Sequence, residues 1–134
     1  MLTVHILSFS FLKGLPADTT GHGGGYVFDC RAIENPGRLP EFANVTGKDS
    51  SVIEFLEQRD DVAPFLEHVF ALADFHIRTF LERDFTDLSF WFGCSGGQHR
   101  SVYCAERLAA HVRESFPMVS IDLRHREQEK KRER

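Results

Sequence analysis

Nine residues, Gly93–Ser101, combine residue types that bind anions. They read Gly-Cys-Ser-Gly-Gly-Gln-His-Arg-Ser and follow an apolar run that ends at Phe92. Glycines allow successive backbone N–H groups to point into one hollow, and a helix that starts after them adds a positive partial charge. Arg100 supplies a planar fork of donors, and Ser95 and Ser101 supply hydroxyl groups. The segment therefore predicts a loop that binds a phosphorylated metabolite.

A second chemistry fits the same loop, because Cys94, Gly97, Arg100 and Ser101 form a Cys-x-x-Gly-x-x-Arg-Ser pattern. This pattern resembles the phosphate loop of cysteine-dependent phosphatases. The resemblance implies a Cys94 thiolate nucleophile with Arg100 on the phosphoryl oxygens. However, Gly93 precedes the cysteine where that family has a histidine. We take ligand binding without catalysis as the first hypothesis, a phosphatase as the alternative, and a protein-interaction adapter as the third.

The sequence around the loop predicts an α/β fold, a single layered domain with a central parallel or mixed sheet flanked by helices. Apolar runs and alternating apolar residues predict strands at residues 2–12, 26–30, 88–92 and 119–123. Helical spacing predicts a helix of about five turns from residue 61 and a second helix from His99 to Phe116.

Smaller signals refine this expectation. Ser51 and Glu54 form a capping-box pattern that predicts the start of a short helix. The glycine-rich stretch 19–25 predicts a surface loop. Trp91 and Tyr103 flank the segment Gly93–Ser101, which we call the anion loop, and both are expected in the core rather than on a base-stacking surface.

Composition indicates one domain that needs no disulfide or metal. The 134 residues are 42% hydrophobic and include thirteen Phe, which is enough to bury one core. The three cysteines are odd in number and far apart, which favours a reducing compartment. The seven histidines lack the close spacing of metal ligands, so we expect no metal and no other cofactor. Without a membrane-length apolar stretch or a secretory signal, the protein is expected to be cytoplasmic and away from membranes.

Five segments in order along the chain resemble one known family. They are Ser8–Pro16 (SFSFLKGLP), Val27–Arg31 with the following Asn35-Pro36, Thr46-Gly47 with Asp49, Gly93–Ala105, and Arg124–Arg126. The corresponding family segments read SFGFKxGxP, VFDVR with NP, TGxD, GCTGGxHRSV and RHR. Over nearly its whole length the chain therefore resembles the C-terminal domain of the RNase adapter protein RapZ.

The resemblance implies a non-catalytic module that senses an amino-sugar phosphate, glucosamine 6-phosphate in the best-understood members. It also implies contact with a small regulatory RNA and assembly into a homo-oligomer. Carried over position by position, it gives a ligand-binding set of Lys13, Asp29, Arg31, Asn35, Cys94, Ser95, Gly96, Gly97, His99, Arg100 and Ser101.

Some positions depart from the family or allow a second interpretation. Lys13 stands where the family often has His or Tyr, and Ser95 replaces Thr. Asp29 and Arg31 could hold a ligand or form ion pairs. His99 could contact the ligand, cap the helix or bond Asp29. No G-x-x-x-x-G-K-[ST] segment occurs in the chain, so we expect no nucleotide hydrolysis and a separate nucleotide-binding or kinase protein as a partner.

The last eleven residues form a charged segment that we expect to be separate from the 1–123 domain. Residues 124–134 contain six Lys or Arg against three Glu, whereas the rest of the chain is acidic. The segment is expected either to be a solvated or disordered tail or to bind RNA weakly through Arg124, Arg126, Lys130, Lys131 and Arg132. Truncation after Leu123 is then expected to abolish RNA binding and leave the anion loop intact.

Overall fold

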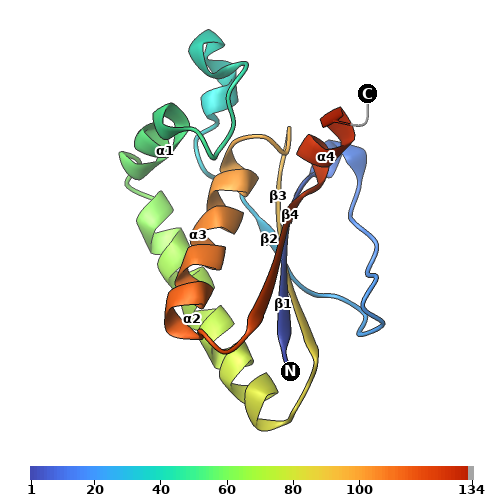
Figure 1. The fold of residues 1–134 in the computed structure, drawn as a ribbon. Helices are drawn as coiled ribbons and strands as arrows, with labels where there is room; N and C mark the ends of the chain where they lie inside the picture. The colour runs from blue at the N-terminus through green and yellow to red at the C-terminus, as the bar shows by residue number, and fades with distance from the viewer. Residues whose placement is uncertain (133–134) are drawn as a thin grey trace.

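Four strands form one sheet in the computed structural model, which describes residues 1–132. The strands are β1 (Thr3–Ser10), β2 (Gly25–Asp29), β3 (Asp87–Cys94) and β4 (Ser120–His125). Their spatial order is β2-β3-β1-β4, and all three neighbouring pairs are parallel. The expected α/β fold is confirmed, and the sheet is parallel rather than mixed. All strands therefore end at the same edge, where the anion loop begins (Figure 1).

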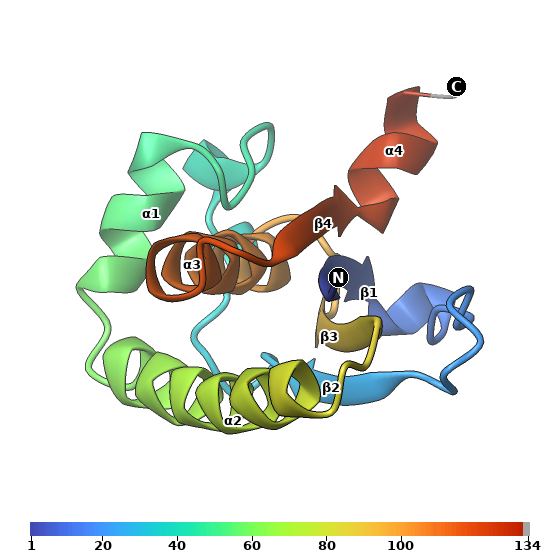
Figure 2. The ribbon, with the colours of Figure 1, turned by 60° about the horizontal axis from the view of Figure 1, so that its bottom comes forward.

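Two long helices, α2 (Val62–Glu82) and α3 (Arg100–Ser115), cover one face of this sheet, as Figure 2 shows. The shorter helix α1 (Ser50–Glu57) packs against α2. Short helical turns occupy Phe11–Lys13 (η1), Pro36–Arg38 (η2) and Pro40–Phe42 (η3), and α4 spans Arg126–Arg132.

The helical spacing in the sequence corresponds to the buried face of α3. Val102, Ala105, Leu108, Ala109 and Val112 are all buried, as the periodic pattern predicts. Except for Val102, they belong to a core that includes Phe90 and Phe92 from β3 and Val4 and Ile6 from β1. Burial of these apolar side chains, about 1.5–3 kcal/mol for each large one, holds α3 against the sheet.

Two local expectations differ from the structure. Helix α1 begins at Ser50 with Asp49 as its N-cap, so Ser51 lies inside the helix and the expected capping box does not form. The Asp49 carboxylate instead accepts a hydrogen bond from the Thr46 backbone N–H at 2.7 Å. This bond closes the turn before α1, and the Asp49 side chain makes no hydrogen bond to the helix N–H groups.

The boundary expected after Leu123 falls inside β4. His125, the last residue of this strand, is buried and bonds to Ser8 Oγ at 2.6 Å and to Glu106 Oε2 at 2.7 Å. These contacts join β4 to β1 and α3. The described part of the charged segment is therefore the end of a strand followed by a helix, not a solvated tail.

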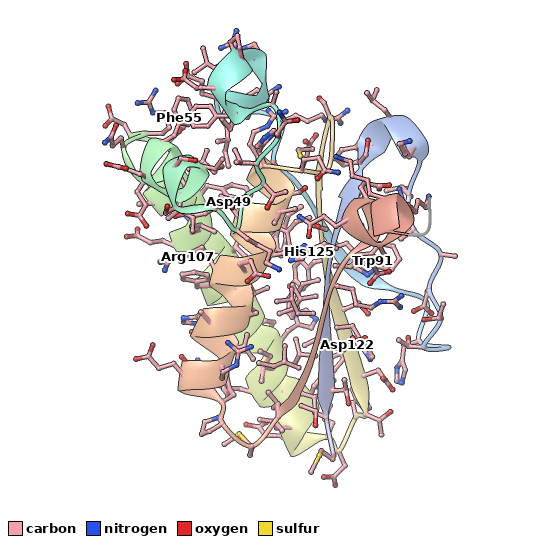
Figure 3. The ribbon with its side chains drawn as sticks, turned by 45° about the horizontal axis from the view of Figure 1, so that its top comes forward. Asp49, Phe55, Trp91, Arg107, Asp122 and His125 are labelled. Carbon is pink, nitrogen blue, oxygen red and sulfur yellow. The ribbon has the colours of Figure 1, made fainter. Side chains whose placement is uncertain are left out.

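The opposite face of the sheet carries the segment between β1 and β2 and the start of α4 (Figures 1 and 2). Trp91 lies on this face with Asp122, whereas His125 lies on the helix side (Figure 3). Tyr103 is buried in the core as expected, but Trp91 is only partly buried and lines a cavity. The expectation for Trp91 is wrong because odd-numbered positions of β3 point away from α2 and α3.

Candidate anion-binding site

The anion loop joins the end of β3 to the start of α3 at the carboxyl edge of the sheet. In parallel sheets, ligands bind beyond this edge, where helix N-termini also point. Gly97 has φ +71°, a conformation that favours glycine. A Cβ atom there would lie 2.6 Å from Glu127 Cγ and 3.0 Å from the Ser10 backbone nitrogen. Both the backbone twist and the close packing therefore require glycine at this position.

A cavity of about 210 Å³ lies between this loop and the turn that follows β2. We call it the loop cavity, and it is lined by Asn35, Gly37, Cys94, Gly96, Gln98, His99 and Arg100. Asn35 caps η2, and its Oδ1 accepts a hydrogen bond from the Gly37 N–H at 2.9 Å. Two parts of the predicted ligand-binding set, about sixty positions apart, thus meet in one hollow.

Arg100 is the buried charge of the loop cavity, with a relative exposure of 4%. Its Nη1 donates to the carbonyl oxygens of Arg31 (2.9 Å) and Ile33 (2.8 Å). Its Nε is fully buried and has no hydrogen-bond partner among the described residues. A buried, unpaired charged donor is costly, and an anion in the cavity would supply the missing acceptor.

Gln98 and His99 add polar groups with different roles. The buried Oε1 of Gln98 also lacks a partner among residues 1–132, and Gln98 lines the same cavity as Arg100. His99 Nε2 lies 2.8 Å from the Phe42 carbonyl oxygen, to which it donates a hydrogen bond. The ring therefore neither caps α3 nor bonds Asp29, and it ties the loop to η3. Its Nδ1 faces Gly37 and lines the cavity.

Cys94 and Ser101 form a buried pair at the base of the loop. The Cys94 Sγ and Ser101 Oγ atoms are 3.1 Å apart, and both residues are almost completely buried. Cys94 lines the cavity, but Ser101 does not. The Ser101 hydroxyl group, predicted as a ligand donor, thus pairs with the cysteine thiol, and either group can donate the hydrogen bond.

Asp29, Arg31 and Lys13 lie at the same edge but do not line the loop cavity. The Arg31 guanidinium pairs with both Asp29 oxygens, at 2.8–3.1 Å, and stacks over the Phe11 ring at 4.0 Å. The hydrogen bond from Arg31 lowers the pKa of Asp29 below its ordinary value. Lys13 is exposed at the end of η1. The Arg31 carbonyl connects this group to Arg100 by a hydrogen bond, and the Arg100 charge also helps to lower the pKa of Asp29.

Sequence reasoning missed the residues that brace the loop from behind. Ser10 Oγ donates to the Ser95 carbonyl at 2.5 Å, and the Ser10 N–H donates to Glu127 Oε2 at 2.9 Å. Glu127 is buried, and Arg126 Nε donates to the same carboxylate oxygen. A glutamate in a charged terminal segment gives no sequence signal of burial. The expectation that truncation after Leu123 spares the loop is therefore unsupported, since the truncation removes Glu127.

The predicted RNA-binding residues differ in how free their charges are. Arg124 forms a two-point pair with Glu129, at 3.0 and 2.9 Å, and Arg126 donates to Glu127 and to the Gly14 carbonyl. Lys130 and Lys131 are exposed on α4. The side chain of Arg132 lies outside the described residues. The available charge on the described part of the segment is therefore mainly that of the two lysines.

Within residues 1–132, no group of three or more His, Cys, Asp or Glu side chains is placed to hold a metal ion. The three cysteines are buried and free. None of the described helices is long and apolar enough to cross a membrane.

Two proteins with similar sequences align with most of the chain. It is 36% identical over 126 residues to a nucleotide-binding protein of Paracidovorax citrulli, which covers 94% of this chain and 41% of that protein. A nucleotide-binding protein of Xanthomonas axonopodis pv. citri is 37% identical over 123 residues, covering 91% of this chain and 41% of the relative. The chain thus spans about two fifths of the length of these relatives.

A family model described as the RapZ C-terminal domain matches residues 2–129. The match contains β1 to β4, the whole anion loop and Glu127. The residues that line the loop cavity and those that brace it therefore all lie within the matched range. The chain belongs to the RapZ C-terminal domain family.

Proposed function

We propose that this chain binds a phosphorylated sugar in the loop cavity and acts as a regulatory adapter rather than as an enzyme. The observation that carries the proposal is Arg100, whose buried Nε has no acceptor among the described residues and which lines the cavity. A phosphate group at the N-terminus of α3 would accept from Arg100 and from loop N–H groups. The phosphate would give the unpaired Arg100 Nε an acceptor, and this new hydrogen bond favours binding.

The non-phosphate part of the ligand would meet uncharged polar groups. Gln98 Oε1 is an unpaired acceptor, so a hydroxyl or amino group of a sugar suits it. Asn35 and His99 line the same cavity. Together with the family resemblance, this favours an amino-sugar phosphate such as glucosamine 6-phosphate over inorganic phosphate alone.

The adapter role would depend on partners outside this chain. The relatives are named nucleotide-binding proteins, so a nucleotide-binding protein is the first partner we propose. Assembly into a homo-oligomer and contact with a small regulatory RNA are further parts of the proposal. For RNA, Lys130 and Lys131 supply the exposed cations of the described segment.

The loop gives a variant that tests ligand binding without removing a buried charge. A Cβ atom at Gly96 would meet no atom within 4 Å, and Gly96 lines the cavity. Gly96→Val should therefore fold normally and obstruct the ligand. We expect calorimetric titration with glucosamine 6-phosphate to show at least about tenfold weaker binding, a change of about 1.4 kcal/mol.

Ala110→Val is the matched control, since it adds similar volume at an exposed position of α3. It should bind as the wild type does. Equal affinity in Gly96→Val and the wild type would place the ligand elsewhere and contradict the proposal. Binding of inorganic phosphate as tight as that of the sugar phosphate would contradict the sugar part alone.

One observation favours the phosphatase alternative. Cys94 lines the loop cavity, and its sulfur lies 3.1 Å from the Ser101 hydroxyl oxygen, a distance at which the hydroxyl could support a thiolate nucleophile. Against it, Arg100 donates to two backbone carbonyls, and Asp29 is paired with Arg31 rather than free to act as an acid. Catalysis therefore remains the second candidate.

A further inference from the structure

A second cavity, of about 230 Å³, lies on the sheet face away from α2 and α3. We call it the sheet-face cavity. Its base consists of β1, β3 and β4, and its rim consists of residues 16–20 and the beginning of α4. Trp91 and Asp122, which line it, are seen on this face in Figure 3. The proposed sugar-phosphate site shares none of its lining residues.

Strand register explains why this face is hollow. Residues on the open face form two neighbouring rows across the sheet. The first row is Gly25, Ser89, His5 and Asp122, and the second is Val27, Trp91, Leu7 and Arg124. The small side chain of Ser89 lies next to the large indole of Trp91, and both residues line the cavity. The register therefore leaves space beside an aromatic surface, which an aromatic ring can fill.

The acidic side chains that line the sheet-face cavity already have partners. The Asp18 carboxylate accepts from the N–H and hydroxyl of Thr20 and from the Gly23 N–H, which lower its pKa to about 2. Asp122 bonds to His5 at 3.0 Å. Glu129 accepts two hydrogen bonds from Arg124. These carboxylates therefore have little capacity left for a ligand cation.

The two arginines of the cavity keep an unused donor group. Arg124 binds Glu129 through Nε and Nη2. Arg126 uses Nε and Nη2 for Glu127, and Nη2 also for backbone carbonyls. Among the described residues, no acceptor lies within hydrogen-bond distance of either Nη1. Unused guanidinium donors in the same cavity as an indole ring suit a ligand that is both aromatic and anionic.

We propose that the sheet-face cavity binds a small aromatic anion, a planar ring that carries a phosphate or carboxylate group. The ring contacts Trp91, and the charged group accepts hydrogen bonds from Arg124 and Arg126. The size of the cavity favours a single small molecule of about the size of a mononucleotide or smaller.

Trp91 is the only tryptophan in the chain, so its indole N–H resonance reports on this cavity alone. The test is a nuclear magnetic resonance titration of the full chain with uridine 5′-monophosphate, benzoate, uridine and inorganic phosphate. A saturable shift with uridine 5′-monophosphate supports the phosphate source, and one with benzoate supports the carboxylate source. Uridine and inorganic phosphate should bind at least about tenfold more weakly. No shift with either aromatic anion, or an equal shift with phosphate, overturns the proposal.

Charge variants test whether Arg124 recognises the anionic group of the ligand or acts only through the overall charge of the protein. Arg124→Gln should weaken the aromatic anion about tenfold or more, and Arg124→Lys should retain most of the affinity. Arg124 is largely exposed, and circular dichroism checks that both variants fold. Arg113→Gln, on the exposed side of α3, is the matched control. Unchanged affinity in Arg124→Gln overturns the anion assignment.

Gly96→Val distinguishes the two cavities. It should leave the Trp91 titration unchanged, because Gly96 does not line the sheet-face cavity. Loss of the Trp91 shift in this variant would mean that the probe acts through the loop cavity, and would overturn the second site while leaving the sugar-phosphate proposal standing.

Discussion

The loop cavity and the sheet-face cavity are built in different ways from the same sheet. The loop cavity is formed mainly by one continuous backbone turn after β3, and its buried charge is Arg100. The sheet-face cavity is formed by side chains from β1, β3 and β4, and its arginines are partly exposed. A turn must use particular residue types to hold its conformation, whereas a strand face accepts many. The first cavity therefore has a sequence motif and the second has none.

The largest expected effect tests whether a buried charge dominates the loop cavity. Arg100→Ala should weaken sugar-phosphate binding by about 10 to 150-fold, since one desolvated charged donor contributes about 1.5 to 3 kcal/mol. Calorimetry measures the affinity, and thermal melting checks the fold, because the variant also frees the Arg31 and Ile33 carbonyls. If folded Arg100→Ala keeps the full sugar-phosphate affinity, the buried charge does not dominate the loop cavity, and this difference from the sheet-face cavity is contradicted.

The next effect tests whether the loop depends on its braces. Gly97→Ala should destabilise the protein by about 2 kcal/mol, because alanine must adopt a positive φ and its Cβ meets Glu127. Gly96→Ala, one position earlier, should change stability by less than about 0.5 kcal/mol because its Cβ has open space. Urea unfolding of both variants measures the difference. Similar losses in the two would show that Glu127 does not brace the loop.

A smaller effect concerns RNA and α4. Lys130→Gln combined with Lys131→Gln should reduce the log-log salt slope of single-stranded RNA binding by about 1.4, which is about 0.7 for each phosphate that a lysine no longer neutralises. Sugar-phosphate affinity should stay the same, because neither lysine lines the loop cavity. Charge variants replace truncation after Leu123, since truncation would also remove Glu127. An unchanged slope would assign RNA binding to the folded body.

The free energy of unfolding should depend modestly on pH, because His5 on the open sheet face titrates near neutral pH. Burial lowers the pKa of His5, but hydrogen bonds and charge from Asp87 and Asp122 outweigh burial and raise it above 6.5. The stabilisation from protonated His5 is therefore complete below about pH 6.5, and it is lost as pH rises through the raised pKa of the folded state. Because the groups are partly exposed, the loss should stay below about 1 kcal/mol.

Thermal melting between about pH 6 and pH 8 measures this loss. His5→Gln should remove most of the dependence, and His68→Gln, at an exposed position of α2, should retain it. Identical pH profiles for His5→Gln and the wild type would show that the His5 network does not stabilise the open face.

The smallest expected effect separates binding from catalysis in the loop. Cys94→Ser should change sugar-phosphate affinity by less than about twofold, because the substitution keeps a small polar group beside Ser101. The wild type should release no phosphate from an aryl phosphate. Turnover that disappears in Cys94→Ser would favour the phosphatase alternative and make Cys94 the nucleophile.

Sequence alone was sufficient for the features that depend on local residue types and spacing. The apolar period of α3 and the run Leu88–Phe92 predicted a helix and a buried strand, because backbone periodicity determines which side chains share a face. Gly97 and Arg100 likewise marked the loop, since a positive φ needs glycine and a fork of donors needs arginine.

Only the tertiary structure decided how those residues are used. Arg100 donates to the carbonyls of Arg31 and Ile33, and Glu127 packs behind Gly97. Ser10 and Glu127 are 117 positions apart, and no local pattern links them. The same holds for Trp91 and Arg124, which share a row on the open face through the register of three parallel strands. Such contacts depend on strand order and register, which arise from packing of the whole chain rather than from neighbouring residues.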